Sequence, residues 1–171
     1  RMRYGEAVDM RGGGHFSGRL TAPIVAAGAV CMHMLATKGI QVGTHIAKLK
    51  DIEDIPFDET NLKRDIELLQ TKKFAALDDK RGEAMIAMIM EARQNQDSIG
   101  GILDTAVIGL EAGLGEPEFD SIESLLSHAM FSIPAVKGIE FGEGFHFADL
   151  YGSQANDAFA MQDGTVVTKT N

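Results

Sequence analysis

The chain has 171 residues, of which 44% are apolar and 24% charged, so it is long enough to bury a hydrophobic core in one domain. Its formal net charge of −9 and its pI of about 4.9 argue against a nucleic-acid or anionic-membrane partner, because such partners are attracted to basic surfaces. The single cysteine, Cys31, excludes an internal disulfide and a cysteine-based zinc site.

The sequence also lacks the patterns expected of a membrane span, a signal peptide and a zinc site. No run approaches the roughly 18 apolar residues of a membrane span, and no signal peptide opens the chain. The five histidines show no zinc-ligand spacing, so we expect no metal site. A lone cysteine is compatible with the reducing cytosol. The chain begins with Arg1 and ends in a strand-like run, which indicates a piece of a longer protein.

Hydrophobic spacing and helix-capping residues predict alternating helices and strands up to residue 110. A helix is expected over 21–38, with Thr21 as its N-cap. Its apolar stripe would consist of Ile24, Ala27, Cys31, Met34 and Leu35. The elements that follow are a strand over 40–49, an acidic loop over 51–60, helices over 61–72 and 79–95, and a strand over 98–110. Gly100 and Gly101 indicate a bulge or a close backbone approach in that last strand.

The rest of the chain adds shorter elements. Asp120 and Glu123 resemble a capping box for a helix ending near Phe131, with Ile122, Leu125, Leu126 and Ala129 facing inward. The remaining predictions are a strand over 135–141, a turn over 142–144, a short helix or irregular segment over 145–151, and a hairpin of strands 159–161 and 165–170. Because several strands are neighbours joined by turns, we expect an α+β fold with mainly antiparallel sheet.

Residues 11–23, R-G-G-G-H-F-S-G-R-L-T-A-P, form a glycine-rich loop immediately before a helix. Glycines let backbone amides approach a ligand, and a helix N-terminus attracts anions. The Ser17 hydroxyl and the Arg19 guanidinium would add hydrogen bonds to a phosphate or carboxylate. A purely structural glycine loop is the alternative. A nucleotide-binding P-loop is disfavoured because its G-K-[ST] ending is absent.

Two further stretches carry candidate chemistry. Residues 131–145, F-S-I-P-A-V-K-G-I-E-F-G-E-G-F, would expose amides to a flat ring or a phosphate, unless Pro134 and Gly138 merely shape a turn. In Q-D-S-I-G-G, residues 96–101, turn and cap roles are favoured for Asp97 and Ser98 over those of an acid and a nucleophile. No histidine stands at a persuasive sequence position to activate Ser98.

Taken in order, these stretches resemble the chorismate synthase family. The matching motifs are R-G-G-G-x-x-S-G-R, D-S-I-G-G-I, G-L-G-E-P-E-F-D, S-I-P-A-V-K-G-I-E-F-G-E-G-F and G-S-Q-A-N-D. The resemblance implies a cytoplasmic, homotetrameric flavoprotein lyase of the shikimate pathway and aromatic amino acid biosynthesis. Its reaction is the 1,4-anti elimination of phosphate from 5-enolpyruvylshikimate 3-phosphate, which gives chorismate and requires reduced FMN. Helices packed between antiparallel sheets, a β-α-β sandwich, are the fold it implies.

The resemblance also implies which residues have a role. Residues 1–171 would be a single incomplete domain from the central part of the family's chain, with no catalytic residue and no activity alone. The positions implied to contact FMN are His15, Phe16, Ser17, Pro134 and Ala135, and those implied to bind substrate are Ser17, Gly18 and Arg19. A catalytically inert anion-binding or assembly module diverged from the family is the alternative.

The chain departs from the family's common R-S-S-A-R-E-T pattern at four positions. His15 replaces an arginine, and the other three replacements are Phe16 for serine, Gly18 for alanine and Leu20 for glutamate. Histidine is only partly charged near neutral pH, so the replacement at position 15 removes a permanent cation. Asn95 and Gln96 likewise stand where arginine and glycine are common.

Overall fold

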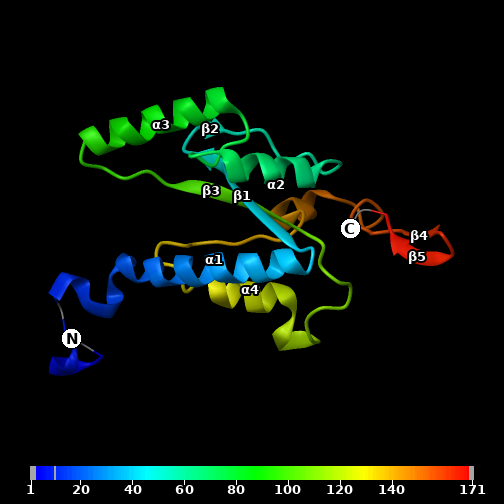
Figure 1. Cartoon of the computed structure of the whole chain (residues 1–171), viewed down its shortest axis with the longest axis horizontal. Helices are drawn as coiled ribbons and strands as arrows, with labels where there is room; N and C mark the ends of the chain where they lie inside the picture. Colours follow the sequence, from blue (N-terminus) through cyan, green and yellow to red (C-terminus); the bar gives the residue numbers. More distant parts are fainter. Residues whose placement is uncertain (1–2, 10, 170–171) are drawn as a thin grey trace. The chain divides into compact units, whose positions relative to one another are not determined.

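The computed structural model describes residues 3–9 and 11–169, which form two compact units divided between Leu114 and Gly115 (Figure 1). The first unit contains α1 (Thr21–Thr37), β1 (Gln41–Leu49), β2 (Ile52–Glu53), α2 (Leu62–Thr71), α3 (Asp79–Gln94) and β3 (Gly101–Ile108). The second contains α4 (Ile122–Met130), β4 (Phe159–Gln162) and β5 (Thr165–Thr168). Every strand pairing in the described ranges is antiparallel, which confirms the α+β prediction.

The sheet of the first unit has the strand order β2-β1-β3. Its register shifts by one residue between Ile46 and Lys48, opposite the start of β3. A Cβ atom at Gly101 would lie 2.7 Å from the carbonyl oxygen of Lys48, so only glycine fits this approach. The close backbone approach predicted at this glycine pair is therefore confirmed. The acidic loop predicted over 51–60 is wrong at Ile52–Glu53, because two residues are too few to show an alternating pattern.

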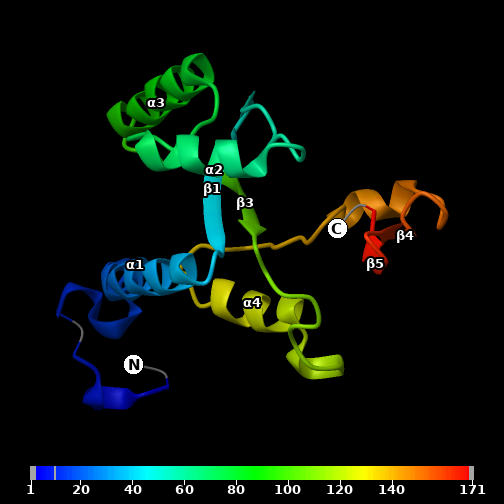
Figure 2. The same ribbon diagram turned by 45° about the vertical axis from the view of Figure 1, so that its right-hand side comes forward.

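The core of the first unit lies where α2 packs on the sheet (Figures 1 and 2). Its buried apolar residues are Leu49, Ile66, Leu69, Ala76, Leu77 and Met85. Ile66 is fully buried and packs directly on Gly43 of β1, where an added Cβ would come within 2.6 Å of Ile66 Cγ1. The absence of a side chain at Gly43 thus sets how closely α2 approaches the strand.

The four long helices form close to their predicted positions, but two N-caps differ. A 3₁₀ turn, Gly18–Leu20, precedes α1, and Ser17 rather than Thr21 caps this turn by accepting a hydrogen bond from the Arg19 amide. At α4 the cap is Ser121, which accepts from the Ser124 amide, and Asp120 lies in the preceding 3₁₀ turn. Serine is as good an N-cap as aspartate, so Ser121 can take the role that was predicted for the residue before it.

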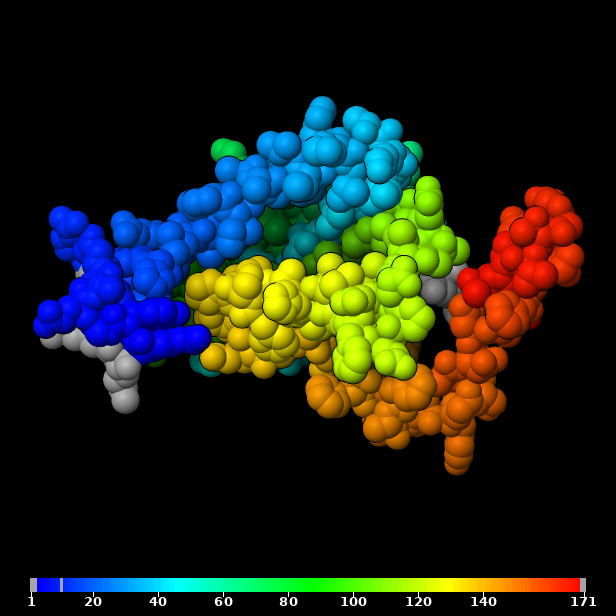
Figure 3. All heavy atoms as spheres, turned by 90° about the horizontal axis from the view of Figure 1, so that it is seen from below, coloured from blue at the N-terminus to red at the C-terminus, as the bar shows by residue number. Residues whose placement is uncertain are grey.

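The α1 helix is apolar on every side, and none of its residues is buried. One side of this helix is seen uncovered in Figure 3. The run Gly18–Thr37 has 20 residues with a mean hydropathy of 1.6, which corrects the expectation that no run approaches the length of a membrane span. One such helix is weak evidence for a span, because the core helix of a soluble protein has the same composition. Apolar residues all round are typical of a helix that other elements surround.

The second unit departs further from the predictions. The strand predicted over 135–141 is wrong, since these residues are a turn and irregular backbone, and Ala135 has a left-handed φ of +72°. Leu125 and Leu126 of α4, predicted to face inward, are 49% and 46% exposed. The predicted hairpin is confirmed as β4 and β5, joined through Asp163 and Gly164 at positive φ.

Candidate functional site

Three consecutive glycines set the path of the glycine-rich loop. Gly12, Gly13 and Gly14 have φ values of 59°, 83° and 55°, in the left-handed region that other residues rarely adopt. A Cβ atom at Gly14 would overlap the carbonyl oxygen of Asp9, so the loop lies tightly against the segment before it. The loop therefore has a shape that only glycines permit.

Ser17 and Arg19 both lie against these glycines. A guanidinium nitrogen of Arg19 lies 3.8 Å from the Cβ position of Gly12, and the Ser17 Cβ lies 3.3 Å from that of Gly13. Within residues 3–9 and 11–169, Arg19 forms no ion pair. The loop thus brings a hydroxyl and an unneutralised guanidinium together at the start of α1.

Arg11, at the other end of the loop, has a partner. Its side chain donates to both carboxylate oxygens of Asp9, with the shortest distance 2.6 Å. Hydrogen bonds from Arg11 hold the pKa of the Asp9 carboxyl below its ordinary value, and the same pairing raises the pKa of Arg11. Of these two arginines, only Arg19 is left free to hold an anionic ligand.

His15 and Phe16, both implied flavin contacts, are exposed and lie against each other. Their ring centroids are 4.2 Å apart, and the Tyr4 ring lies 5.9 Å from His15 and 6.1 Å from Phe16. Sequence reasoning missed Tyr4, because a single tyrosine in an irregular segment has no periodicity or motif spacing that would mark it.

Pro134 and Ala135 belong to the second unit and follow α4. Both are exposed, and Ala135 has a positive φ although it carries a Cβ. Backbone strain of this kind costs about 1 kcal/mol or more and is concentrated at functional sites. Residues 132–136 make consecutive tight turns, in which the Ile133 amide donates to Met130 and the Val136 amide donates to Ile133.

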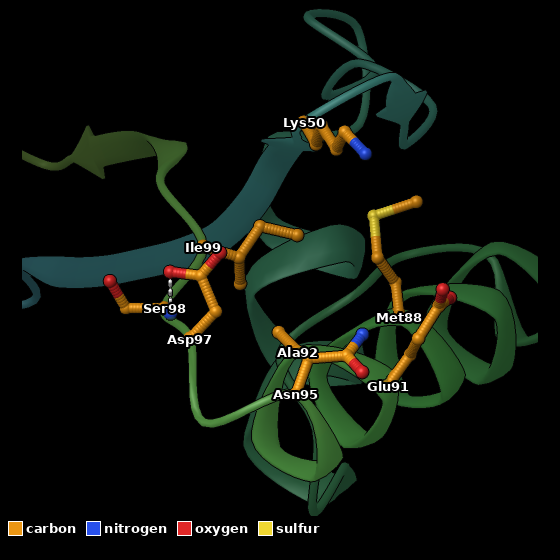
Figure 4. Close-up of a pocket in the computed structure, with 8 residues that line it drawn as sticks. All are labelled: Lys50, Met88, Glu91, Ala92, Asn95, Asp97, Ser98 and Ile99. Carbon is orange, nitrogen blue, oxygen red and sulfur yellow. Dashed lines mark hydrogen bonds between the residues drawn. The ribbon is translucent and has the colours of Figure 1, made fainter.

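The D-S-I-G-G stretch borders a shallow cavity between the end of α3 and the end of β1 (Figure 4). Asp97 accepts a hydrogen bond from the Ser98 amide at 2.8 Å, and the Asp97 amide itself donates to Ala92. Gln96 has a φ of +54°, at a position where the family commonly has glycine. These contacts are those of a helix-ending turn and support the structural interpretation of Asp97 and Ser98.

A buried ionisable pair in the first unit carried no sequence signal. His45 of β1 is fully buried, and its Nδ1 lies 2.9 Å from Asp54, whose carboxylate also accepts from the amides of Leu77 and Asp78. Burial alone would raise the pKa of Asp54, but hydrogen bonds from these two amides and from His45 lower it on balance. The pair ties β1 to the segment that enters α3, which is a structural role.

The fold and the glycine loop together define an α+β protein in which a serine hydroxyl and a guanidinium unpaired among the described residues lie against a glycine loop. Comparison with known sequences makes this specific: the model of the chorismate synthase family matches residues 1–171, so the chain belongs to that family. The protein named chorismate synthase in Lancefieldella parvula is 38% identical over 99% of this chain, which covers 47% of that protein. Its counterpart in Thermococcus kodakarensis is 43% identical, with 95% and 44% covered.

Comparison with solved structures agrees with this family assignment. A crystal structure of chorismate synthase superposes with a TM-score of 0.78 and 28% sequence identity, covering 91% of this chain and 49% of that one. The chain therefore spans about half the length of the curated relatives and the solved structure that it matches.

Proposed function

We propose that residues 1–171 are the central part of a chorismate synthase, a carbon–oxygen lyase of aromatic amino acid biosynthesis. The reaction breaks the bond between carbon and the phosphate oxygen of 5-enolpyruvylshikimate 3-phosphate and removes a proton, which gives chorismate and inorganic phosphate. The observation that carries this proposal is the free Arg19 guanidinium beside Ser17 in a glycine loop, within a chain that belongs to this family.

The candidate site residues suit both proposed ligands, the substrate phosphate and FMN. Arg19 would hold the phosphate of the substrate through charge-assisted hydrogen bonds, which strengthen as negative charge grows on the departing group. Ser17 would donate its hydroxyl to the same phosphate, and Gly18 leaves room for it. His15 and Phe16 provide exposed ring surface for FMN, and Pro134 and Ala135 provide exposed backbone. When bound, reduced FMN supplies an electron-rich ring beside the bond that breaks.

Activity would need the remainder of the family's chain. The family resemblance leaves no catalytic acid or base within residues 1–171, so these residues bind and orient ligands but do not move the proton. We propose that the full-length chain is cytoplasmic and assembles as a homo-oligomer, a tetramer as in the family. Binding without turnover in the full-length chain would instead favour the inert anion-binding module.

Arg19→Ala in the full-length chain tests the proposal. A charge-assisted hydrogen bond contributes about 1.5–3 kcal/mol, so substrate affinity should fall roughly 10- to 100-fold. Arg11→Ala is the matched control, because Arg11 is already paired with Asp9 and should change affinity little. Calorimetric titration with substrate in the presence of FMN measures both. Equal affinities for Arg19→Ala and the parent chain would contradict the proposal.

His15→Arg tests the same loop by adding a permanent positive charge, whereas Arg19→Ala removes one. It restores the permanent cation that is common in the family, so anionic ligands should bind more tightly than to the parent chain. His15→Gln is the control, since it keeps a polar side chain without adding charge. Titration with FMN and with substrate compares the variants, and a weaker affinity in His15→Arg would show that no anion lies near position 15.

A further inference from the structure

Three aromatic rings gather where the segment before the glycine loop meets that loop. The centroids of Tyr4, His15 and Phe16 lie 4.2–6.1 Å apart, in tilted and edge arrangements. Tyr4 is 47% exposed and Phe16 is 60% exposed, so the rings support one another and still present ring surface to solvent. Exposed, mutually supported rings are suited to stack against a planar ligand ring.

One arginine contacts this aromatic cluster and another follows it closely in the sequence. The Arg3 guanidinium carbon is 5.4 Å from the centroid of Tyr4, and Arg19 follows Phe16 by three residues. Neither arginine forms an ion pair with any residue that the structure describes. In a chain of net charge −9, an unneutralised guanidinium on the cluster and a second one on the glycine loop favour a planar ligand that also carries negative charge.

The glycine loop explains how Tyr4 reaches the other two rings. Gly14 lies so close to the Asp9 carbonyl that any side chain at position 14 would overlap it. This approach folds the segment that carries Tyr4 back onto the loop that carries His15 and Phe16. The same close approach therefore requires glycine at position 14 and brings Tyr4 to the rings of His15 and Phe16.

We propose that Tyr4 joins His15 and Phe16 in a surface that stacks on the isoalloxazine ring of the flavin. The proposal rests on the function proposed above and extends its cofactor site to a residue in the segment before the loop. Tyr4 contributes through its ring and not through its hydroxyl, because its side chain contacts His15, Phe16 and Arg3 through the ring.

The experiment compares the binding of two flavins, FMN and lumiflavin, to the full-length chain. FMN carries a phosphate, whereas lumiflavin has the same ring system without one, so lumiflavin reports on the ring surface alone. Tyr4→Ala and Phe16→Ala should each weaken both flavins roughly three- to tenfold, the range expected for loss of an aromatic contact. Tyr4→Phe should bind like the parent chain. Arg19→Ala should leave lumiflavin affinity unchanged.

Two readouts separate stacking from a general loss of structure. Flavin fluorescence quenching gives the affinities, and the shift of the visible flavin absorption band on binding reports on ring contact directly. Tyr4→Leu, which keeps an apolar side chain, should retain the parent's circular dichroism spectrum and still reduce the band shift. Tyr151→Ala, at an 80% exposed tyrosine of the second unit, is the control and should change neither readout.

The outcomes distinguish this inference from the proposed function. If the parent chain binds FMN, and Tyr4→Ala and Tyr4→Leu keep its lumiflavin affinity and band shift, the role of Tyr4 is overturned and the proposed function stands. If the parent chain binds neither flavin, both are overturned. A loss restored by Tyr4→Phe supports the stacking surface.

Discussion

Asp54→Ala should destabilise the first unit more than a typical substitution. The buried carboxylate accepts hydrogen bonds from His45 Nδ1 at 2.9 Å and from the amides of Leu77 and Asp78 at 2.5 and 3.0 Å. Each buried donor that loses its partner costs about 1–3 kcal/mol, and breaking a buried charged pair typically costs about 3–5 kcal/mol. We therefore expect the free energy of unfolding to fall by about 3–5 kcal/mol.

Thermal and urea unfolding followed by circular dichroism measure this loss. A change of about 3 kcal/mol corresponds to a fall in Tm of roughly 6–12 °C in a chain of this size. Asp54→Asn keeps one acceptor oxygen and should lie between Asp54→Ala and the parent. Asp51→Ala, at an exposed position nearby, should change stability by less than about 0.5 kcal/mol. A loss below about 1 kcal/mol in Asp54→Ala would refute the role of this carboxylate as the link between β1 and the start of α3.

Further substitutions test three local features of the first unit. Gly43→Ala forces a Cβ against Ile66 and should cost about 1–3 kcal/mol in urea unfolding, and Ile66→Ala in the same chain should make that cost smaller. Hydrogen bonds from the side chains of Thr60 and Asn61 lower the pKa of Asp58 from 3.8 to about 2. The charged Asp58 carboxylate therefore stabilises the fold fully above about pH 4, and this stabilisation is lost as the pH falls towards 2. Asp58→Asn should flatten a plot of Tm against pH over that range. Gln96→Gly should stabilise the chain by about 1 kcal/mol, because Gln96 has a left-handed φ of +54°; no gain in Tm would exclude strain there.

The long helices and strands could be predicted because their patterns are local. The close approach at Gly101 and the turn at Gly164 depend on glycine, whose backbone preferences are strong, whereas the cap before α1 was expected at Thr21 and is formed by Ser17. The motifs of the glycine loop likewise predict Ser17 and Arg19 as ligand contacts, and this assignment stays a prediction. Whether Arg19 is free and Arg11 is paired could not be predicted, because it depends on how the loop folds back onto Asp9.

The features that sequence reasoning missed or predicted wrongly depend on contacts and backbone conformations that local patterns do not report. His45 was not recognised because its environment comes from residues 9 to 33 positions away, which no local pattern reports. The strand predicted at 135–141 does not form, because the left-handed backbone at Ala135 is incompatible with a strand that begins there. The inward face predicted for α4 assumed a partner element, and its leucines are about half exposed in the described chain.

The α1 helix has no polar face, so the sequence does not set its rotation about its own axis. Its orientation is fixed at its two ends. The turn capped by Ser17 leads directly into the helix, and at the other end the amides of Lys38, Gly39 and Ile40 bond back to its last turn before β1 begins. The helix therefore forms a rigid connection about 26 Å long between the glycine loop and the sheet. A packing change at the start of β1 would rotate α1 about its axis. It would thereby move the Arg19 guanidinium although no residue of the glycine loop is changed.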